Sequence, residues 1–172
     1  MSRPPARRRL LWLLACLAAA LGAPAARALD PPAGRIVLSV TGEVARRNAG
    51  EGADFDLAML ERLPQKSLTT ATPWYPSPRR FTGVLLRDLL AAAGARGTTA
   101  RAIALNDYQV DIPLADAERH DVLIAWLLDG QPMAVRDKGP LVVMYPFDSH
   151  PELRDAVHYG RAAWQLRRLD IR

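Results

Sequence analysis

Side chains that could bind a ligand gather in three short segments of the sequence. Residues 69–74 (TTATPW) place three hydroxyls beside an indole, and residues 106–108 (NDY) place a carboxylate and a phenol at a turn. Residues 136–140 (RDKGP) put two cations beside a Gly-Pro turn, an arrangement that suits an anionic ligand. Convergent polar and aromatic groups of this kind line ligand pockets. The set is completed by three residues near the C-terminal end, Tyr159, Arg161 and Trp164.

Each of the three segments also has a purely structural interpretation. A hydroxyl-rich β-strand capped by a packed tryptophan accounts for residues 69–74. Asn-Asp is a common turn pair, and cations beside a Gly-Pro turn are typical of a solvated hairpin tip. The binding and the structural interpretations therefore both stay open.

Several well-defined catalytic motifs are missing from the sequence. Gly50-Glu51-Gly52 is followed by Phe55 where a dinucleotide-binding loop needs its third glycine, and no glycine-rich loop ends in Lys-Ser or Lys-Thr. Asp148-Ser149-His150 is contiguous, whereas the members of a catalytic triad converge from separate segments, and no serine lies on a nucleophile elbow. The sequence therefore supports neither nucleotide binding nor serine hydrolysis.

The histidines were considered as metal ligands. His150 and His158, with Asp148 or Glu152, offer nitrogen and oxygen ligands within a short stretch. Their spacing matches no common metal-binding pattern, and histidines in surface loops are ordinary. We therefore assign no metal ligand from the sequence.

The first half of the chain must position the first candidate segment. Alternating apolar residues predict a strand over 36–41, followed by a small, polar loop over 48–54. Asp56 is placed to cap a short helix that Pro64 ends. A second strand is expected over 66–72. Three prolines then predict an irregular loop over 73–78, because they exclude both a helix and a central strand.

The clearest helix is predicted to start at a Thr82 cap and to end at Gly94, with its leucines on one stripe. The remaining elements are mainly strands, expected over 102–105, 108–112, 122–128 and 141–145, with a helical turn over 152–157; residues 164–171 are left unassigned. Strands that follow one another without alternating helices indicate the α+β class, with six to eight strands and two or three helices. Residues 29–172 are expected to form a single domain.

Residues 1–28 have the features of an export signal. They contain the basic cluster Arg7-Arg8-Arg9, an apolar run of about 14 residues and a small-x-small exit that predicts cleavage after Ala28. A membrane anchor is the competing interpretation, but a spanning helix needs about 20 residues. We expect a periplasmic or secreted protein without a stable anchor after cleavage. The arginines resemble a twin-arginine signal and also fit an ordinary basic region, so the export route stays open.

The segment 1–28 also holds the excess positive charge and the single cysteine. The sequence has 23 Lys+Arg and 18 Asp+Glu, and the five arginines of residues 1–28 account for the whole excess. The remaining chain is neutral and has no cysteine, because Cys16 lies in the signal. A neutral surface argues against nucleic-acid binding, and a chain without cysteine has no disulfide and no thiolate metal site.

Four motifs together resemble the oxidoreductase molybdopterin-binding domain of the sulfite oxidase family, in its short, exported, single-domain members. The motifs, in chain order, are Phe81–Leu90 (FTGVLLRDLL) followed by Gly94, then Asp129–Pro132 (DGQP), Gly139–Leu141 (GPL) and Trp164–Leu166 (WQL). The resemblance covers residues 36–171. It implies a mixed α+β sheet fold and a molybdenum-pterin cofactor whose metal is ligated by a cysteine thiolate.

This chain departs from the family pattern at two positions. The family's cysteine lies in the loop after the second strand, which here contains Thr72, Pro73 and Trp74, and Leu141 stands where the enzymes tend to place an arginine that meets the pterin phosphate. Both departures argue against thiolate-bound molybdenum, and molybdopterin itself is implied by the resemblance alone. A pocket for some small ligand is still expected, framed by six residues: Thr70, Trp74, Asp107, Tyr108, Arg136 and Tyr145.

Three functional hypotheses follow. The leading one is an exported protein that keeps the molybdopterin-binding fold without a thiolate-ligated molybdenum centre and binds or senses a small ligand outside the cytoplasm. The second is an active molybdopterin-dependent oxidoreductase with a metal ligand other than cysteine, so enzymatic activity is left open. The third is a partner module of a membrane sensor or an electron-transfer complex, with Trp74 and Tyr75 as the contact.

Overall fold

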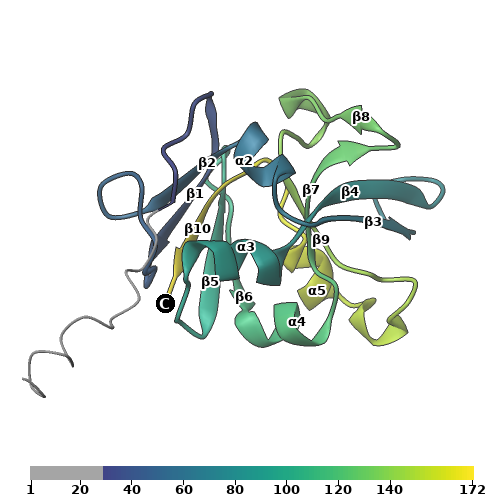
Figure 1. Ribbon diagram of the computed structural model, residues 1–172. Coiled ribbons are helices and arrows are strands. Elements are labelled where there is room, and N and C mark those ends of the chain that lie inside the picture. The colour runs from purple at the N-terminus through teal and green to yellow at the C-terminus, as the bar shows by residue number, and fades with distance from the viewer. Residues whose placement is uncertain (1–28) are drawn as a thin grey trace, which may run out of the picture.

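The computed structural model describes residues 29–172, and the predicted export signal, residues 1–28, lies outside the described residues (Figure 1). The described chain forms two five-stranded sheets. The first sheet contains, in spatial order, β2 (Ala53–Asp56), β1 (Ile36–Gly42), β10 (Leu166–Ile171), β5 (Thr99–Ala104) and β6 (Gln109–Pro113). The second contains β3 (Gln65–Thr70), β4 (Arg79–Leu85), β7 (Leu123–Leu128) and β8 (Gln131–Pro132), with β9 (Val142–Met144) also paired to β7.

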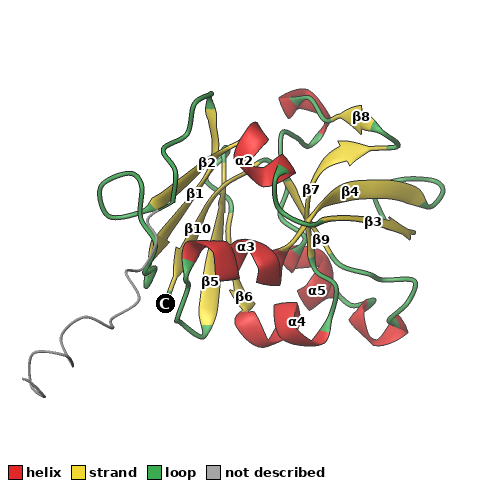
Figure 2. Cartoon of the chain, in the orientation of Figure 1, coloured by secondary structure: helices red, strands yellow, loops and turns green. Residues whose placement is uncertain are grey.

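Short helices connect and cover the sheets. They are α2 (Leu57–Glu61), α3 (Leu86–Ala93), α4 (Leu114–Arg119) and α5 (Ala156–Arg161), with 3-10 turns η2 (Val135–Asp137) and η3 (Pro151–Leu153). Helix α2 contacts β2 and β4 and so touches both sheets. Figure 2 shows α3, α4 and α5 in the lower half of the molecule, where the two sheets meet. The predicted α+β class is confirmed by this arrangement.

The start of α2 and the end of α3 form as the sequence predicts. The Asp56 carboxylate accepts the backbone N–H of Met59 at 2.8 Å and caps α2. It also accepts the N–H groups of Ala33 and Gly34, at 2.8 and 2.7 Å. These amides, that of Gly34 first, hold the pKa of Asp56 below its ordinary value. At the end of α3, Gly94 takes the left-handed conformation that closes a helix.

The predicted Thr82 cap is wrong, because Thr82 lies in the middle of β4. Its hydroxyl pairs with Ser67 across the sheet at 2.7 Å, and α3 begins only at Leu86. Strand β4 is paired on both sides, with β3 and β7, and this pairing outweighs the local helical pattern. Gly83 lies at a register shift against β7, where a Cβ atom would meet the Ile124 carbonyl oxygen at 2.0 Å. The glycine of the FTG motif therefore permits close strand approach.

Other departures concern elements that form through distant contacts. Ten strands are present in residues 29–172, more than the six to eight expected. Residues 166–171, left unassigned from sequence, form β10, which pairs in parallel with β1 and antiparallel with β5. Strand β2 begins inside the expected loop 48–54, and α4 was not expected. Among residues 29–172, no helix is long and apolar enough to cross a membrane.

Candidate functional site

A pocket with a volume of about 240 Å³ opens between segments that are far apart in the sequence. One wall comes from the loop after β3 and from the β5–β6 turn. The other comes from the end of α5 and the segment that leads into β10. Eight residues line it: Trp74, Asn106, Tyr108, Tyr159, Gly160, Ala162, Ala163 and Trp164. The long-range pairing of β10 between β1 and β5 brings the C-terminal wall to this position.

Three aromatic rings form the rigid part of the pocket. The Trp74 ring packs edge-on against Trp164, with ring centroids 5.1 Å apart at 88°, and against Tyr159, at 6.0 Å and 81°. Tyr159 in turn contacts the fully buried Phe147 at 4.7 Å. Edge-to-face pairs of this geometry are favourable beyond their buried area. The core therefore supports the rings and fixes the shape of the pocket.

The part of the first wall that comes from the β5–β6 turn is polar and more exposed. Tyr108 is 45% exposed, and its hydroxyl donates to the Gly160 carbonyl oxygen at 3.0 Å, which joins the β5–β6 turn to α5. The Asn106 side-chain oxygen accepts the Tyr108 backbone N–H at 3.2 Å. The wall thus combines an amide and a phenol that solvent or a ligand can reach.

One polar atom of the pocket lacks a partner. The indole N–H of Trp164 is buried and makes no hydrogen bond among the described residues. Buried donors are normally satisfied, by protein or by a bound molecule. The ammonium group of Lys138 lies 4.7 Å from the centroid of the Trp164 ring and 4.9 Å from that of Tyr75, so a cation borders the pocket without lining it.

Two of the six residues predicted to frame a pocket, Trp74 and Tyr108, line this one. Thr70 is fully buried behind the loop, where its hydroxyl accepts the backbone N–H of Asp148 at 3.2 Å. The Asp148 carboxylate accepts the Ala71 N–H at 2.9 Å. Thr70 therefore anchors the loop that carries Trp74 and does not itself face the pocket.

Asp107 and Arg136 lie at the surface. Asp107 adopts a left-handed backbone conformation at the turn, and its carboxylate pairs with Arg167 at 2.6 Å. The Arg136 side chain is 89% exposed and its nearest charged partner is Asp137, at 3.4 Å. Neither lines the pocket. The structural interpretations of the Asn-Asp turn and of the cationic tip describe these two residues.

Tyr145 belongs to a buried polar network. Its hydroxyl donates to Asp116 at 2.8 Å, and the same carboxylate oxygen accepts from Arg161 at 2.9 Å. Burial raises the pKa of Tyr145 far above its ordinary value, and the Asp116 carboxylate raises it further, so the phenol stays a donor. The network joins α4, α5 and the end of β9 and is separate from the pocket.

The sequence provided partial information on the pocket wall that α5 and the segment before β10 form. Tyr159 and Trp164 stood among the candidates but were not placed in the pocket, because their segment had no assigned structure. Nothing in the sequence marks the small residues Gly160, Ala162 and Ala163, which make room beside the rings. Trp74 and Tyr75, expected as an exposed contact for a partner, are half-buried and pack against the core.

The pocket does not fit a thiolate-ligated molybdenum-pterin cofactor. Trp74 fills the loop in which the resemblance places the metal-ligating cysteine, and its ring packs between Trp164 and Tyr159. Thr72, the hydroxyl residue of that loop, does not line the pocket, and none of the lining residues carries a cation for a phosphate. Leu141, at the position of the family's arginine, is 1% exposed in the core. We therefore derive no chemistry through that cofactor.

Comparisons with known proteins agree with the architecture. The sequence model of one protein family, described as the oxidoreductase molybdopterin binding domain, matches residues 33–147. The sulfane dehydrogenase SoxCD from Paracoccus pantotrophus has a similar structure, with a TM-score of 0.58 and 19% sequence identity over 78% of this chain. The match spans only 37% of that chain, and at this identity it shows the fold alone. A search of curated proteins gives no match. The predicted fold, a mixed α+β domain of the sulfite oxidase type, is confirmed.

Proposed function

The chain belongs to the oxidoreductase molybdopterin-binding domain family, and we propose that it is an exported member that binds a small ligand without thiolate-bound molybdenum. The proposal depends on one observation: an aromatic side chain lines the pocket from the loop in which the resemblance places the metal-ligating cysteine. Trp74 lies in the loop where a metal ligand is expected and lines the pocket together with Trp164 and Tyr159.

The lining of the pocket defines the class of ligand. Aromatic faces and small side chains favour a flat, uncharged molecule, because no lining side chain offers a charge. A volume of about 240 Å³ lies below the roughly 300–1,000 Å³ of pockets for drug-sized ligands. The exposed amide of Asn106 can bond to polar atoms at the ligand's edge. The ligand is therefore a small heteroaromatic compound.

Pterin and indole are the probes for this pocket. Both are flat and uncharged near neutral pH, and pterin adds a carbonyl acceptor that can meet the amide group of Asn106. Each is titrated into purified protein by calorimetry. We expect saturable binding of one molecule per chain, weakened at least about fivefold by Trp74→Ala, since removing one stacking ring costs about 1–3 kcal/mol. Arg136→Ala, at an exposed position outside the pocket, is the matched control and leaves both affinities unchanged.

The outcomes separate the pocket from nonspecific binding. Circular dichroism first establishes that Trp74→Ala is folded. If neither probe saturates the wild-type protein at millimolar concentration, or if Trp74→Ala binds both as tightly as the wild type does, the proposed pocket has no such function.

We also propose that the protein is exported and meets its ligand outside the cytoplasm. This part of the proposal rests on the basic, apolar and small-residue parts of residues 1–28. N-terminal sequencing of the protein recovered from the periplasm or medium should give Leu29 as the first residue. Recovery in the cytoplasm alone, with Met1 or Ser2 as the first residue, would contradict export.

A further inference from the structure

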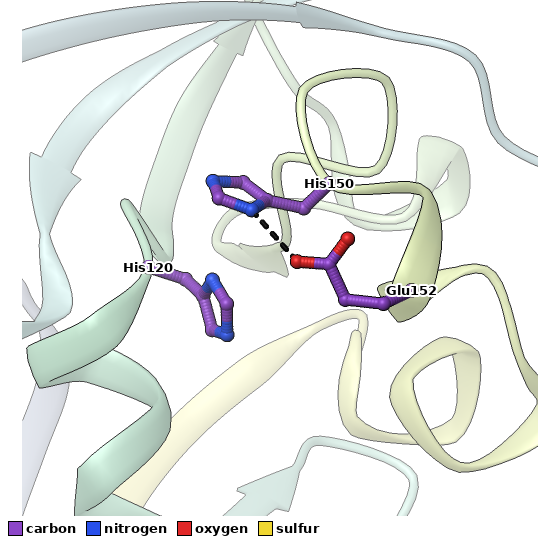
Figure 3. A group of neighbouring side chains, drawn as sticks. All are labelled: His120, His150 and Glu152. Carbon is purple, nitrogen blue, oxygen red and sulfur yellow. Dashed lines mark hydrogen bonds and ion pairs between the residues drawn. The ribbon is translucent and has the colours of Figure 1, made fainter.

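Two histidines and a glutamate meet on a part of the surface that the aromatic pocket does not include. His120 ends α4, whereas His150 and Glu152 flank Pro151 at the start of η3 (Figure 3). One potential ligand atom from each of the three lies within 4.8 Å of the other two. Figure 3 shows the three side chains directed toward one another from two separate segments. From sequence, the candidate ligands were His150 and His158 with Asp148 or Glu152, because nothing in the sequence places His120 beside His150.

The contacts inside the cluster leave one nitrogen unused. The His150 Nδ1 atom lies 2.9 Å from the Glu152 carboxylate, which satisfies both of these groups. The His120 ring packs edge-on against His150, with centroids 4.7 Å apart, yet its Nδ1 atom is buried and has no hydrogen-bond partner. An ion pair between His150 and Glu152 accounts for the positions of these two side chains without a metal. It leaves the third, His120, with a buried Nδ1 atom that has no hydrogen-bond partner.

Backbone hydrogen bonds hold both histidines in place. The His120 N–H donates to the Asp116 carbonyl at 2.9 Å, and the His120 carbonyl accepts from Val122 at 2.8 Å. The His150 N–H donates to the Pro146 carbonyl at 3.1 Å, and the His150 carbonyl accepts from Leu153 at 3.0 Å. The backbone is therefore fixed on both sides, and only side-chain rotation is needed to adjust the ligand atoms.

The cation that approaches the His120 backbone is already paired with a carboxylate. Arg87 approaches the His120 carbonyl oxygen at 3.4 Å, but its guanidinium is paired with Asp121 at 2.7 Å. Glu152 supplies a negative charge at the cluster. The half-buried His150 and exposed Glu152 side chains, 37% and 62% exposed, keep the cluster open to solvent.

We propose that His120, His150 and Glu152 bind a divalent transition metal, with Zn²⁺ as the best fit. Two imidazole nitrogens and one carboxylate oxygen form an established zinc ligand set, which leaves a fourth position for water. Ligand bonds of about 2.0–2.2 Å require the three atoms to draw closer than they lie here. Rotation of the Glu152 side chain, which is exposed, accommodates this change. The site shares no residue with the aromatic pocket and does not depend on the proposed ligand binding.

Calorimetric titration of Zn²⁺ into purified protein that carries no polyhistidine tag tests the proposal. We expect one equivalent to bind per chain. His120→Ala and Glu152→Gln should each weaken binding at least about tenfold, as the loss of one ligand requires. His158→Ala is the matched control, because His158 is bonded to Asp155 at 2.9 Å and lies outside the cluster. It should leave Zn²⁺ affinity within about twofold of the wild-type value.

A second measurement identifies the ligands directly. Co²⁺ replaces Zn²⁺ and should give the visible absorption of a tetrahedral or five-coordinate site in the wild-type protein and in His158→Ala, but not in His120→Ala. The variants are compared by circular dichroism so that loss of the site is separated from loss of the fold. The proposal is overturned if the folded wild type binds no stoichiometric Zn²⁺, or if His158→Ala weakens binding as much as His120→Ala does.

Discussion

Tyr108 and Tyr145 carry the same phenol in two different regions of the molecule. Tyr108 lies on the rim of the aromatic pocket, 45% exposed, and bonds to a backbone carbonyl. Tyr145 is fully buried and bonds to a carboxylate that also holds Arg161. Both were candidate ligand contacts in the sequence. The difference lies in burial and in the kind of partner, a backbone carbonyl at the rim and a carboxylate in the interior, which residue type and spacing do not reveal.

The same contrast extends to the two regions as a whole. The polar network of Asp116, Tyr145 and Arg161 is internally satisfied and stabilises the junction of α4, α5 and the end of β9. The pocket has an unpartnered indole N–H and open volume. We therefore expect changes in the network to lower stability and changes in the pocket to lower ligand affinity.

The largest expected effect follows from breaking the network at its centre. Asp116→Asn removes the charge that Arg161 and Tyr145 share and should lower the free energy of unfolding by about 3 kcal/mol, the low end of the range for a buried pair, because both side chains keep some exposure. Urea unfolding measures it. Asp137→Asn, in an exposed pair with Arg136, should leave the unfolding midpoint unchanged. If Asp137→Asn lowered the free energy of unfolding as much as Asp116→Asn does, buried and surface pairs would not differ as proposed.

The second expected effect compares the two phenols directly. Tyr145→Phe removes a hydrogen bond to a charged group and should lower stability by roughly 1.5–3 kcal/mol. Tyr108→Phe removes an exposed bond to a carbonyl and should cost less than about 1 kcal/mol. Chemical unfolding of the two variants side by side measures the difference. Equal losses would show that Tyr108 is as much part of the fold as Tyr145.

A smaller effect should separate ligand affinity from stability. Asn106→Ala keeps the aromatic rings but removes the exposed amide that lines the pocket. Pterin, which offers a carbonyl acceptor, should bind about fivefold more weakly, corresponding to the roughly 1 kcal/mol of a neutral hydrogen bond. Indole, which offers no such acceptor, should bind almost as before. The unfolding midpoint should fall less than it does in Asp116→Asn. Equal weakening of both probes would assign the loss to packing.

The smallest expected change is that of ligand affinity with pH. No carboxylate, histidine or lysine lines the pocket, and indole itself does not titrate in this range, so indole affinity should be constant between pH 5 and 8. Stability should behave differently in acid. The pKa of Asp56 is lowered by the amide of Gly34, and that of Asp121 by Arg87. Stability from these groups is present above their ordinary value of 3.8 and is lost as the pH falls through their lower folded-state values. A steep affinity change between pH 5 and 8 would contradict the neutral pocket.

Local features of the sequence predicted the parts of the fold that depend on neighbouring residues. The Asp56 cap, the Gly94 helix end and the buried strand before Asp129 were predictable because each depends on a few adjacent residues. Thr82 was misplaced because strand pairing on both sides of β4 decided its conformation. Long-range pairing of this kind leaves no local trace in one sequence.

The same limit explains how much of the candidate site was predictable. Trp74 and Tyr108 follow from residue type next to a strand end and a turn. The wall formed by Tyr159 and Trp164 depends on β10 pairing with β1, whose residues lie more than a hundred positions earlier. The cluster of His120 with His150 depends likewise on the approach of the end of α4 to η3.

Elemental analysis tests most directly the central claim that the family fold is kept here without thiolate-bound molybdenum. The protein is purified from its native compartment in cells supplied with molybdate, and molybdenum and pterin are measured per chain. With Trp74 in the expected cysteine loop and no cation lining the pocket, the result should be molybdenum far below one equivalent. One equivalent of molybdenum, recovered together with one equivalent of pterin, would contradict the account.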